Sequence, residues 1–325
     1  MKRLTLCATA ASLGAALALA GLPAVAQQFP TKPIRFLVGF APGGSVDILA
    51  RDLGGQMTVA LGQQVVIDNR SGAAGLIAAD LTAKAPPDGH TLLMAIPNHV
   101  IAPSVYAKIP YDTINDFAPV SLVASSPFMV LANLGVPANT LKEFIALVKS
   151  KPGQLNFATP GVGSIQHLSN ELMNTMAGIK MVHVPYKGGV PALIDTIAGA
   201  AAITFITTVQ GLPNVKAGKV KVYGVTSARR AAVLPDVPTV SEAGVPGFES
   251  VVWFGVLTSV KTPKPIVDKL NREIKRIIAT PEMRDRVVQQ GGETLSGSAE
   301  DLGKYMRDDL KKWAAAAKQA GIKPE

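Results

Sequence analysis

Short apolar runs alternate with amphipathic segments along most of this chain. Nearly continuous apolar sequence bounded by turn residues is typical of strands that are buried on both faces of a sheet. Such runs lie at residues 34–40, 65–67, 91–96, 120–123, 128–132, 155–158, 202–206, 220–225 and 251–257.

Three helix starts can be recognised among the segments between and after these runs. Thr140 and Glu143 have the spacing of a capping box and open a segment with apolar residues at helical spacing. Pro265 stands in the first turn of a second segment, and Ser298 with Asp301 opens a last one. The alternation of strands and helices predicts an α/β fold with largely parallel sheets.

Two loops of similar composition occur, one in each half of the chain. Each follows an apolar run, contains proline and glycine, ends in serine and precedes a predicted helix. The first is Pro42, Gly43, Gly44 and Ser45 before a helix from Val46, and the second is Pro160 to Ser164 before a helix from Ile165.

These loops can bind an anion. The first N–H groups of a helix lack intrahelical partners and carry a partial positive charge. Glycine allows an anion to approach the backbone, and a serine hydroxyl adds a donor. Two such ends could hold one anion between two lobes, although each loop alone is also consistent with an ordinary strand–helix turn.

Asp47 follows the first loop within the first helical turn. A carboxylate there is stabilised by the helix dipole and could also contact an amine of a ligand. We favour the helix-stabilising role.

The sequence lacks the common catalytic and cofactor motifs. The four histidines are His90, His99, His167 and His183, and none has the spacing of a metal site. Neither loop has the lysine of a P-loop or the third glycine of a dinucleotide site, and no Gly-x-Ser-x-Gly elbow occurs. We therefore expect no metal, no cofactor and no enzymatic activity, with a triad of Ser164, His167 and an acid as the alternative.

The first 26 residues have the three parts of a secretory signal peptide. Lys2 and Arg3 precede an apolar stretch at residues 10–22, and the small residues Ala24 and Ala26 form a small-x-small cleavage motif. We expect export to the periplasm with cleavage after Ala26, and an uncleaved N-terminal anchor is the alternative. Cys7, the only cysteine, lies inside this segment, so the mature chain would contain no disulfide.

The charge favours anionic ligands and argues against nucleic acid. The formal net charge is +9, and removal of Lys2 and Arg3 leaves 30 basic and 23 acidic residues, hence +7. Basic residues are scattered, with Arg229-Arg230 and Lys311-Lys312 as the tightest clusters, and only 5% of residues are aromatic. A nucleic-acid interface would concentrate both types on one face, whereas a diffuse positive field assists the approach of anions.

Taken in order, several segments resemble the Bug family of receptors for tripartite tricarboxylate transporters over essentially the whole mature length. The resemblance lies in residues 29–35, 40–47 with Ala50-Arg51, 87–93, 109–112, 116–120, 183–188, 191–195, 234–239 and 242–244.

The resemblance implies a type II periplasmic-binding-protein fold, with two α/β lobes joined by crossing strands. We expect residues 27–124 with 251–325 in lobe 1 and residues 125–250 in lobe 2. It also implies one small ligand in the cleft and its delivery to the membrane permease subunits of the transporter. Together with the two loops, it leads us to expect a monomer that closes its lobes on a small organic mono- or dicarboxylate. The alternatives are an exported Ser/His hydrolase and a ligand sensor for a two-component system.

The ligand-binding residues are expected in the two loops and around the cleft. The loops would contribute backbone groups of Pro42, Gly43, Gly44, Ser45, Val46 and Asp47, and of Gly161, Gly163 and Ser164. The far end of the ligand would be contacted by Asn98, His99, Thr159, His167, Asp195 and Thr207. Asp195 could face the cleft or be a surface or capping acid.

Overall fold

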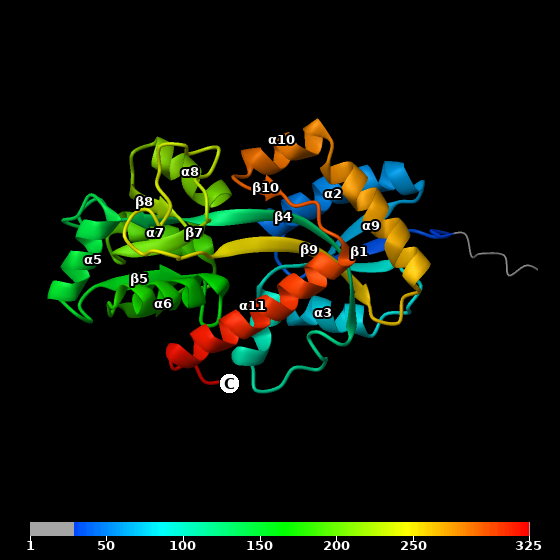
Figure 1. The fold of residues 1–325 in the computed structure, drawn as a ribbon, viewed down its shortest axis with the longest axis horizontal. Coiled ribbons are helices and arrows are strands. Elements are labelled where there is room, and N and C mark those ends of the chain that lie inside the picture. The colour runs from blue at the N-terminus through cyan, green and yellow to red at the C-terminus, as the bar shows by residue number, and fades with distance from the viewer. Residues whose placement is uncertain (1–28, 325) are drawn as a thin grey trace, which may run out of the picture.

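The structure is a computed structural model that describes residues 29–324 (Figure 1). The expected signal peptide, its cleavage site and Cys7 lie outside the described residues. Helices and strands alternate along the described chain, which confirms the α/β class. None of the helices between residues 29 and 324 combines the length and apolar character needed to cross a membrane.

The strands form one path with the order β2-β1-β3-β9-β4-β7-β5-β6, and β10 and β8 also pair with β4. The bounds are β1 (Ile34–Val38), β2 (Val65–Asn69), β3 (Thr91–Ala95), β4 (Phe117–Ala132), β5 (Asn156–Thr159), β6 (Val182–Pro185), β7 (Ile203–Thr207), β8 (Lys221–Val225), β9 (Val251–Ser259) and β10 (Glu293–Thr294). Pairing is parallel in β2-β1-β3 and again in β6-β5-β7, and it is antiparallel wherever β4 or β9 takes part. The expectation of largely parallel sheets therefore holds only for three strands of each lobe, because the crossing strands run antiparallel to their neighbours.

Strands β4 and β9 connect the two lobes. Along β4, residues 117–127 pair with β9, and residues 128–132 pair with β7 and β8. Strand β9 in turn pairs with β3 of lobe 1. Figure 1 shows β4 and β9 running side by side between the lobes, as the crossing strands were expected to do. The division at residues 124 and 251 stays a prediction.

Helices cover both sheets. Their bounds are α2 (Ser45–Leu61), η1 (Ala73–Gly75), α3 (Leu76–Ala83), α4 (Asn98–Ile101), η2 (Ala102–Ser104), α5 (Leu141–Ser150), α6 (Ile165–Ala177), α7 (Gly189–Ala198), α8 (Thr208–Lys216), α9 (Lys264–Ile278), α10 (Pro281–Gln289) and α11 (Ala299–Gln319). Helix α11 lies against β4, α4 and η2, and it also contacts α6 of lobe 2 (Figure 1). The last helix therefore touches both lobes.

The expected helix starts are present, with one change in detail. Ser298 and Asp301 form a complete capping box at α11. At α5 the hydroxyl of Thr140 accepts a hydrogen bond from Glu143 N–H at 3.2 Å, but the Glu143 carboxylate accepts from Asn139 N–H at 2.7 Å. The reciprocal bond is thus displaced by one residue, because the carboxylate reaches past the N-cap.

A buried polar contact joins a crossing strand to the last helix. The indole N–H of Trp253 on β9 donates to the carboxylate of Asp309 on α11 at 2.7 Å. Both side chains are buried, and burial raises the pKa of Asp309. This contact fixes α11 against the strand that connects the lobes.

Candidate functional site

The loops that leave the parallel strands gather at one edge of each sheet. In lobe 1 α2 follows β1, and in lobe 2 α6, α7 and α8 follow β5, β6 and β7. Ligands of open α/β sheets bind outside the carboxyl ends of the strands. The two loops singled out in the sequence lie at such ends, so we define loop 1 as residues 40–47 and loop 2 as residues 159–167.

Loop 1 leads into a helix whose amino end has no side-chain cap. Helix α2 begins at Ser45, one residue earlier than expected, and Gly44 is its N-cap with φ −78° and ψ 166°. No side chain accepts a hydrogen bond from the first turn of α2 at this cap. The amino end of α2 is therefore suited to an external acceptor, such as a carboxylate.

Asp47 stabilises loop 1 from within. Its buried carboxylate accepts hydrogen bonds from Gly43 N–H, Arg51 Nε–H and the Asn69 side-chain amide, each at 2.9 Å. Burial raises the pKa of Asp47, but the hydrogen bonds from Arg51, Gly43 and Asn69 outweigh it, so the pKa lies below its usual value. Both carboxylate oxygens are occupied by partners in lobe 1, which fits the helix-stabilising role.

The polar groups of loop 2 form hydrogen bonds with one another. Ser164 is the N-cap of α6, and its hydroxyl accepts from His167 N–H at 3.2 Å while donating to the Gly161 carbonyl at 2.8 Å. Ser45 is the first residue of α2, whereas Ser164 precedes α6. The two serines, which look equivalent in the sequence, thus occupy different positions.

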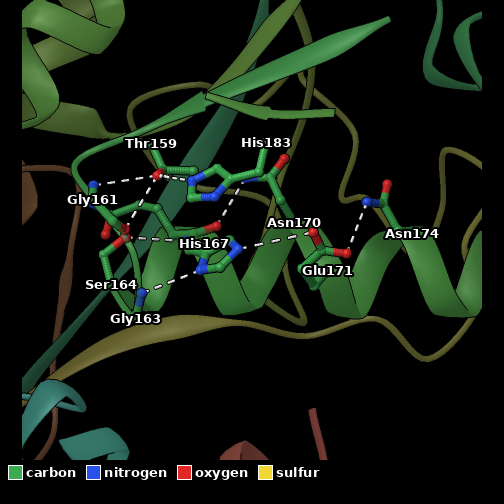
Figure 2. Close-up of polar contacts among 10 residues, drawn as sticks. Thr159, Gly161, Gly163, Ser164, His167, Asn170, Glu171, Asn174 and His183 are labelled. Carbon is green, nitrogen blue, oxygen red and sulfur yellow. Dashed lines mark hydrogen bonds and ion pairs between the residues drawn. The ribbon is translucent and has the colours of Figure 1, made fainter. Parts of the chain in front are cut away.

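Two histidines, His167 and His183, lie beside the glycines of loop 2 (Figure 2). Nδ1 of His167 accepts from Gly163 N–H at 3.2 Å, and Nε2 of His183 lies 2.6 Å from the Thr159 hydroxyl. The imidazoles are stacked, with centroids 3.7 Å apart. Burial, aided by His183, lowers the pKa of His167 to about 3, and burial lowers the pKa of His183 to about 4.

A Ser–His nucleophilic pair is not formed in this arrangement. Ser164 contacts the backbone N–H of His167, while Nδ1 of the His167 ring is used by Gly163. Nε2 of the ring faces Glu171 at 3.9 Å. Neither ring nitrogen of His167 is hydrogen-bonded to the Ser164 hydroxyl, so the contact by which a general base activates a nucleophile is not made here.

Of the other expected contact residues, His99 and Thr207 have local partners. Asn98 and His99 line a small cavity next to loop 1, and Nε2 of His99 donates to the Thr113 carbonyl at 2.9 Å. Burial lowers the pKa of His99 to about 4. The Thr207 hydroxyl donates to the side-chain oxygen of Gln210 at 3.2 Å.

Asp195 also has a neighbour within lobe 2. Burial raises the pKa of Tyr186, and a hydrogen bond with the Asp195 carboxylate raises it further. Asp195 lies in the second turn of α7, so it is not at the amino end of that helix. Its partner Tyr186 packs on Ala158 and Ala192 in lobe 2.

At two of the places where the lobes touch, a glycine faces a β-branched side chain. A Cβ atom on Gly163 of loop 2 would lie 2.4 Å from a methyl carbon of Val105, which follows η2 in lobe 1. A Cβ atom on Gly291, after α10, would lie 2.2 Å from Cβ of Thr208 at the start of α8. We name these the Gly163–Val105 and Gly291–Thr208 contacts. Both require glycine, because a Cβ atom would not fit in either place.

Sequence reasoning missed several of these residues. His183 supports loop 2 from β6, a strand that no apolar run indicated. Val105, Thr208 and Gly291 meet only through the fold. The Gly291-Gly292 pair after a helical segment was the one local signal of a close backbone approach. Between residues 29 and 324 no group of three or more His, Cys, Asp or Glu side chains could hold a metal ion.

Comparison with known proteins gives consistent matches. A family model described as tripartite tricarboxylate transporter family receptor matches residues 49–322. Protein BugT of Bordetella pertussis is 33% identical over 317 residues, which cover 96% of this chain and 97% of BugT. The fold is that of periplasmic binding proteins with two lobes.

Two similar solved structures contain carboxylates. R. palustris Rpa4515 with adipate has a TM-score of 0.83 and 34% identity, over 91% of this chain and 100% of that one. MatC from Rhodopseudomonas palustris with bound malate has a TM-score of 0.78 and 34% identity, over 89% of this chain and 100% of that one.

Proposed function

The chain belongs to the tripartite tricarboxylate transporter receptor family, and from this premise we propose that it captures a small organic mono- or dicarboxylate in the periplasm. The ligand would lie between loops 1 and 2 and be delivered to the permease subunits of a transporter. The protein would act as a monomer without catalysing a reaction.

The uncapped amino end of α2 is the observation that supports this proposal most directly. A carboxylate at a helix amino end gains about 0.3–1 kcal/mol, and up to ~2 kcal/mol where it is partly buried. The one carboxylate of loop 1, Asp47, is engaged by Gly43, Arg51 and Asn69 and does not compete for this position. The adipate and malate in the two similar structures support the same ligand class.

Lobe closure is the proposed mechanism of capture. The Gly163–Val105 and Gly291–Thr208 contacts indicate an arrangement in which the lobes meet. A ligand that touches both loops has more contacts in this arrangement than in an open one, so binding favours closure.

A thermal-shift panel tests the proposal. Mature protein would be heated at pH 7 with adipate, malate, short monocarboxylates and the matching neutral amides. We expect at least one carboxylate to raise the melting temperature in proportion to the logarithm of its concentration, while its amide does not. Stabilisation by amides or sugars but by no carboxylate would contradict the proposal. Mass spectrometry of small molecules released from denatured protein would identify the natural ligand.

A further inference from the structure

His167, at the end of loop 2, stacks on His183 of β6 (Figure 2), and the first side chain is buried while the second is partly buried. The two rings lie 3.7 Å apart at 12°, and Phe157 stacks on His183 at 5.1 Å and 21°. Only 5% of the surface of His167 is exposed. Three stacked rings from β5, β6 and α6 thus form a rigid base for the loop.

Each imidazole accounts for part of the loop's hydrogen bonding. Gly163 N–H donates to Nδ1 of His167, while Thr159 Oγ1 accepts from Gly161 N–H at 3.3 Å and contacts Nε2 of His183. Gly161 and Gly163 have φ angles of 147° and 71°, in the region that favours glycine. Because Gly163 is buried, loss of its acceptor would leave an unpaired N–H group at a cost in free energy.

We propose that His167 and His183 are positioning residues that hold loop 2 in the conformation that faces the ligand, with His167 as a neutral imidazole. Nδ1 of His167 can accept from Gly163 only while it carries no proton, so the ring has its proton on Nε2. That nitrogen faces the Glu171 carboxylate at 3.9 Å. The positioning of loop 2 stands on this geometry, and its consequence for affinity rests on the proposed function.

A proton on His167 would oppose this arrangement in two ways. Nδ1–H would point at Gly163 N–H, and the positive charge would lie against the ring of His183. Glu171 on α6 and His183 on β6 are the titratable groups that face the ring, and the low pKa values of both histidines agree with a neutral pair.

The sign of the pH dependence follows from these directions. An unfolded chain protonates both histidines near pH 6.5, whereas the folded chain resists protonation down to about pH 3 to 4. The stabilisation is therefore complete above about pH 6.5 and decreases as the pH falls toward the folded values.

Nitrogen NMR of the ligand-free mature protein tests the protonation state. We expect His167 Nδ1 to be unprotonated and Nε2 to be protonated at pH 7, with the same pattern at pH 5. A proton on Nδ1, or titration of His167 near its unperturbed value, would overturn the proposal. No ligand is needed, so a failure here is distinct from a failure of the proposed carboxylate function.

A matched pair of variants tests the consequence for the loop. His90 is also buried, and its Nε2 accepts from Thr31 N–H at 3.1 Å in lobe 1, so His90→Leu removes the same kind of bond elsewhere. We expect His167→Leu to speed amide hydrogen exchange at Gly161 and Gly163 by at least about 10-fold, and His90→Leu to leave both unchanged. Equal acceleration in the two variants, or none in His167→Leu, would overturn the positioning role.

Adipate supplies the functional arm of this test, and His167→Asn supplies a conservative replacement with an acceptor oxygen. We expect His167→Leu to weaken adipate binding by about 10-fold, His167→Asn to recover part of the loss, and His90→Leu to bind as wild type. Wild-type affinity in His167→Leu, despite fast exchange of the loop, would contradict the functional half. If the wild-type protein itself does not bind adipate, the exchange result still decides the positioning role.

Discussion

Loops 1 and 2 each contain a glycine turn that a side-chain acceptor holds in front of a helix, but the acceptor differs between them. In each loop, a glycine with positive φ precedes the N-cap, and the N–H of this glycine donates a hydrogen bond to the side chain four residues later. The acceptor is the Asp47 carboxylate for Gly43 and the His167 imidazole for Gly163. The cap differs as well, since Gly44 leaves α2 without a side-chain cap and Ser164 caps α6.

Neither acceptor adds an unpaired negative charge that would repel an anionic ligand. Asp47 is ionised but is paired with Arg51 at 2.9 Å, while His167 is neutral. The loops differ in the backbone N–H groups of the first helical turn. In α2 no side chain caps these groups, so they can bind an external acceptor, whereas in α6 the Ser164 hydroxyl accepts from one of them. Under the proposed function, this difference predicts that loop 1 provides most of the donors to the carboxylate and that loop 2 closes over it.

The largest expected effect comes from giving α2 the cap that α6 already has. Gly44 has an extended backbone, and a Cβ atom there would meet only the Ala41 carbonyl at 3.7 Å, so Gly44→Asp fits. The new carboxylate would accept from the first turn and repel the ligand. We expect carboxylate affinity to fall by about 100-fold, or ~2.7 kcal/mol, in calorimetric titrations. Gly44→Ala is the uncharged control, and an equal loss in that variant would show that the donors of α2 are not the cause.

Removal of the support for loop 1 should cost stability. Asp47→Ala deletes the acceptor of Gly43 N–H and removes one hydrogen bond each from Asn69 and the half-exposed Arg51, which keep their own contact at 3.1 Å. After allowance for solvent around Arg51, we expect the free energy of unfolding in urea to fall by about 2 kcal/mol. Because the pKa of Asp47 is lowered on folding, this stabilisation is present above pH 3.8 and decreases as the pH falls through the folded value.

Asp308→Ala is the matched control for that change. Asp308 also forms an ion pair with a helical residue four positions away, Lys304, at 2.7 Å, but on an exposed surface. We expect no measurable change in stability for this variant. Similar losses for Asp47→Ala and Asp308→Ala would mean that Asp47 contributes only as a surface ion pair.

A smaller effect is expected where the lobes meet. Gly291→Ala places a Cβ atom against Thr208 and should hold the lobes apart, which weakens ligand binding by about 10-fold, or ~1.4 kcal/mol. Gly218→Ala is the control, because φ is +66° there against +76° at Gly291, and nothing lies within 4 Å of the added atom. Because the two glycines have similar positive φ angles, the variants differ mainly in the contact with Thr208, and only Gly291→Ala should enlarge the ligand-saturated protein in X-ray scattering. Equal scattering curves would contradict a closed arrangement through this contact.

The sequence predicted most of the strands because buried parallel strands are continuous apolar runs. It divided β4 into two, since Ser125, Ser126 and Pro127 look like a turn. The strand continues because Pro127 lies where the partner of β4 changes from β9 to β7 and β8. Strand β6 was missed because it is partly exposed and shows no apolar run.

For the site, the sequence located both loops but not what distinguishes them. The Pro-Gly-Ser pattern identifies strand–helix turns, because those residues favour the backbone angles and caps that such turns need. Whether a serine is an N-cap or the first helical residue depends on one residue of register, which the pattern does not specify. The contact of His183 with Thr159 joins two strands through the sheet, so no local spacing could reveal it.

That register difference gives the smallest of these predictions. Ser164→Ala removes the cap of α6, so we expect the free energy of unfolding to fall by about 1 kcal/mol. Ser45→Ala removes a hydroxyl that caps nothing in α2, and we expect a change within about 0.5 kcal/mol. Equal losses of stability would mean that the two serines contribute equally and that the amino end of α2 is capped by a side chain as that of α6 is. Hydrolysis of a panel of esters by the same variants tests the hydrolase alternative. Because the ring of His167 does not contact the Ser164 hydroxyl, we expect wild type and Ser164→Ala to show the same background hydrolysis. Turnover by wild type that is lost in Ser164→Ala would overturn the receptor assignment.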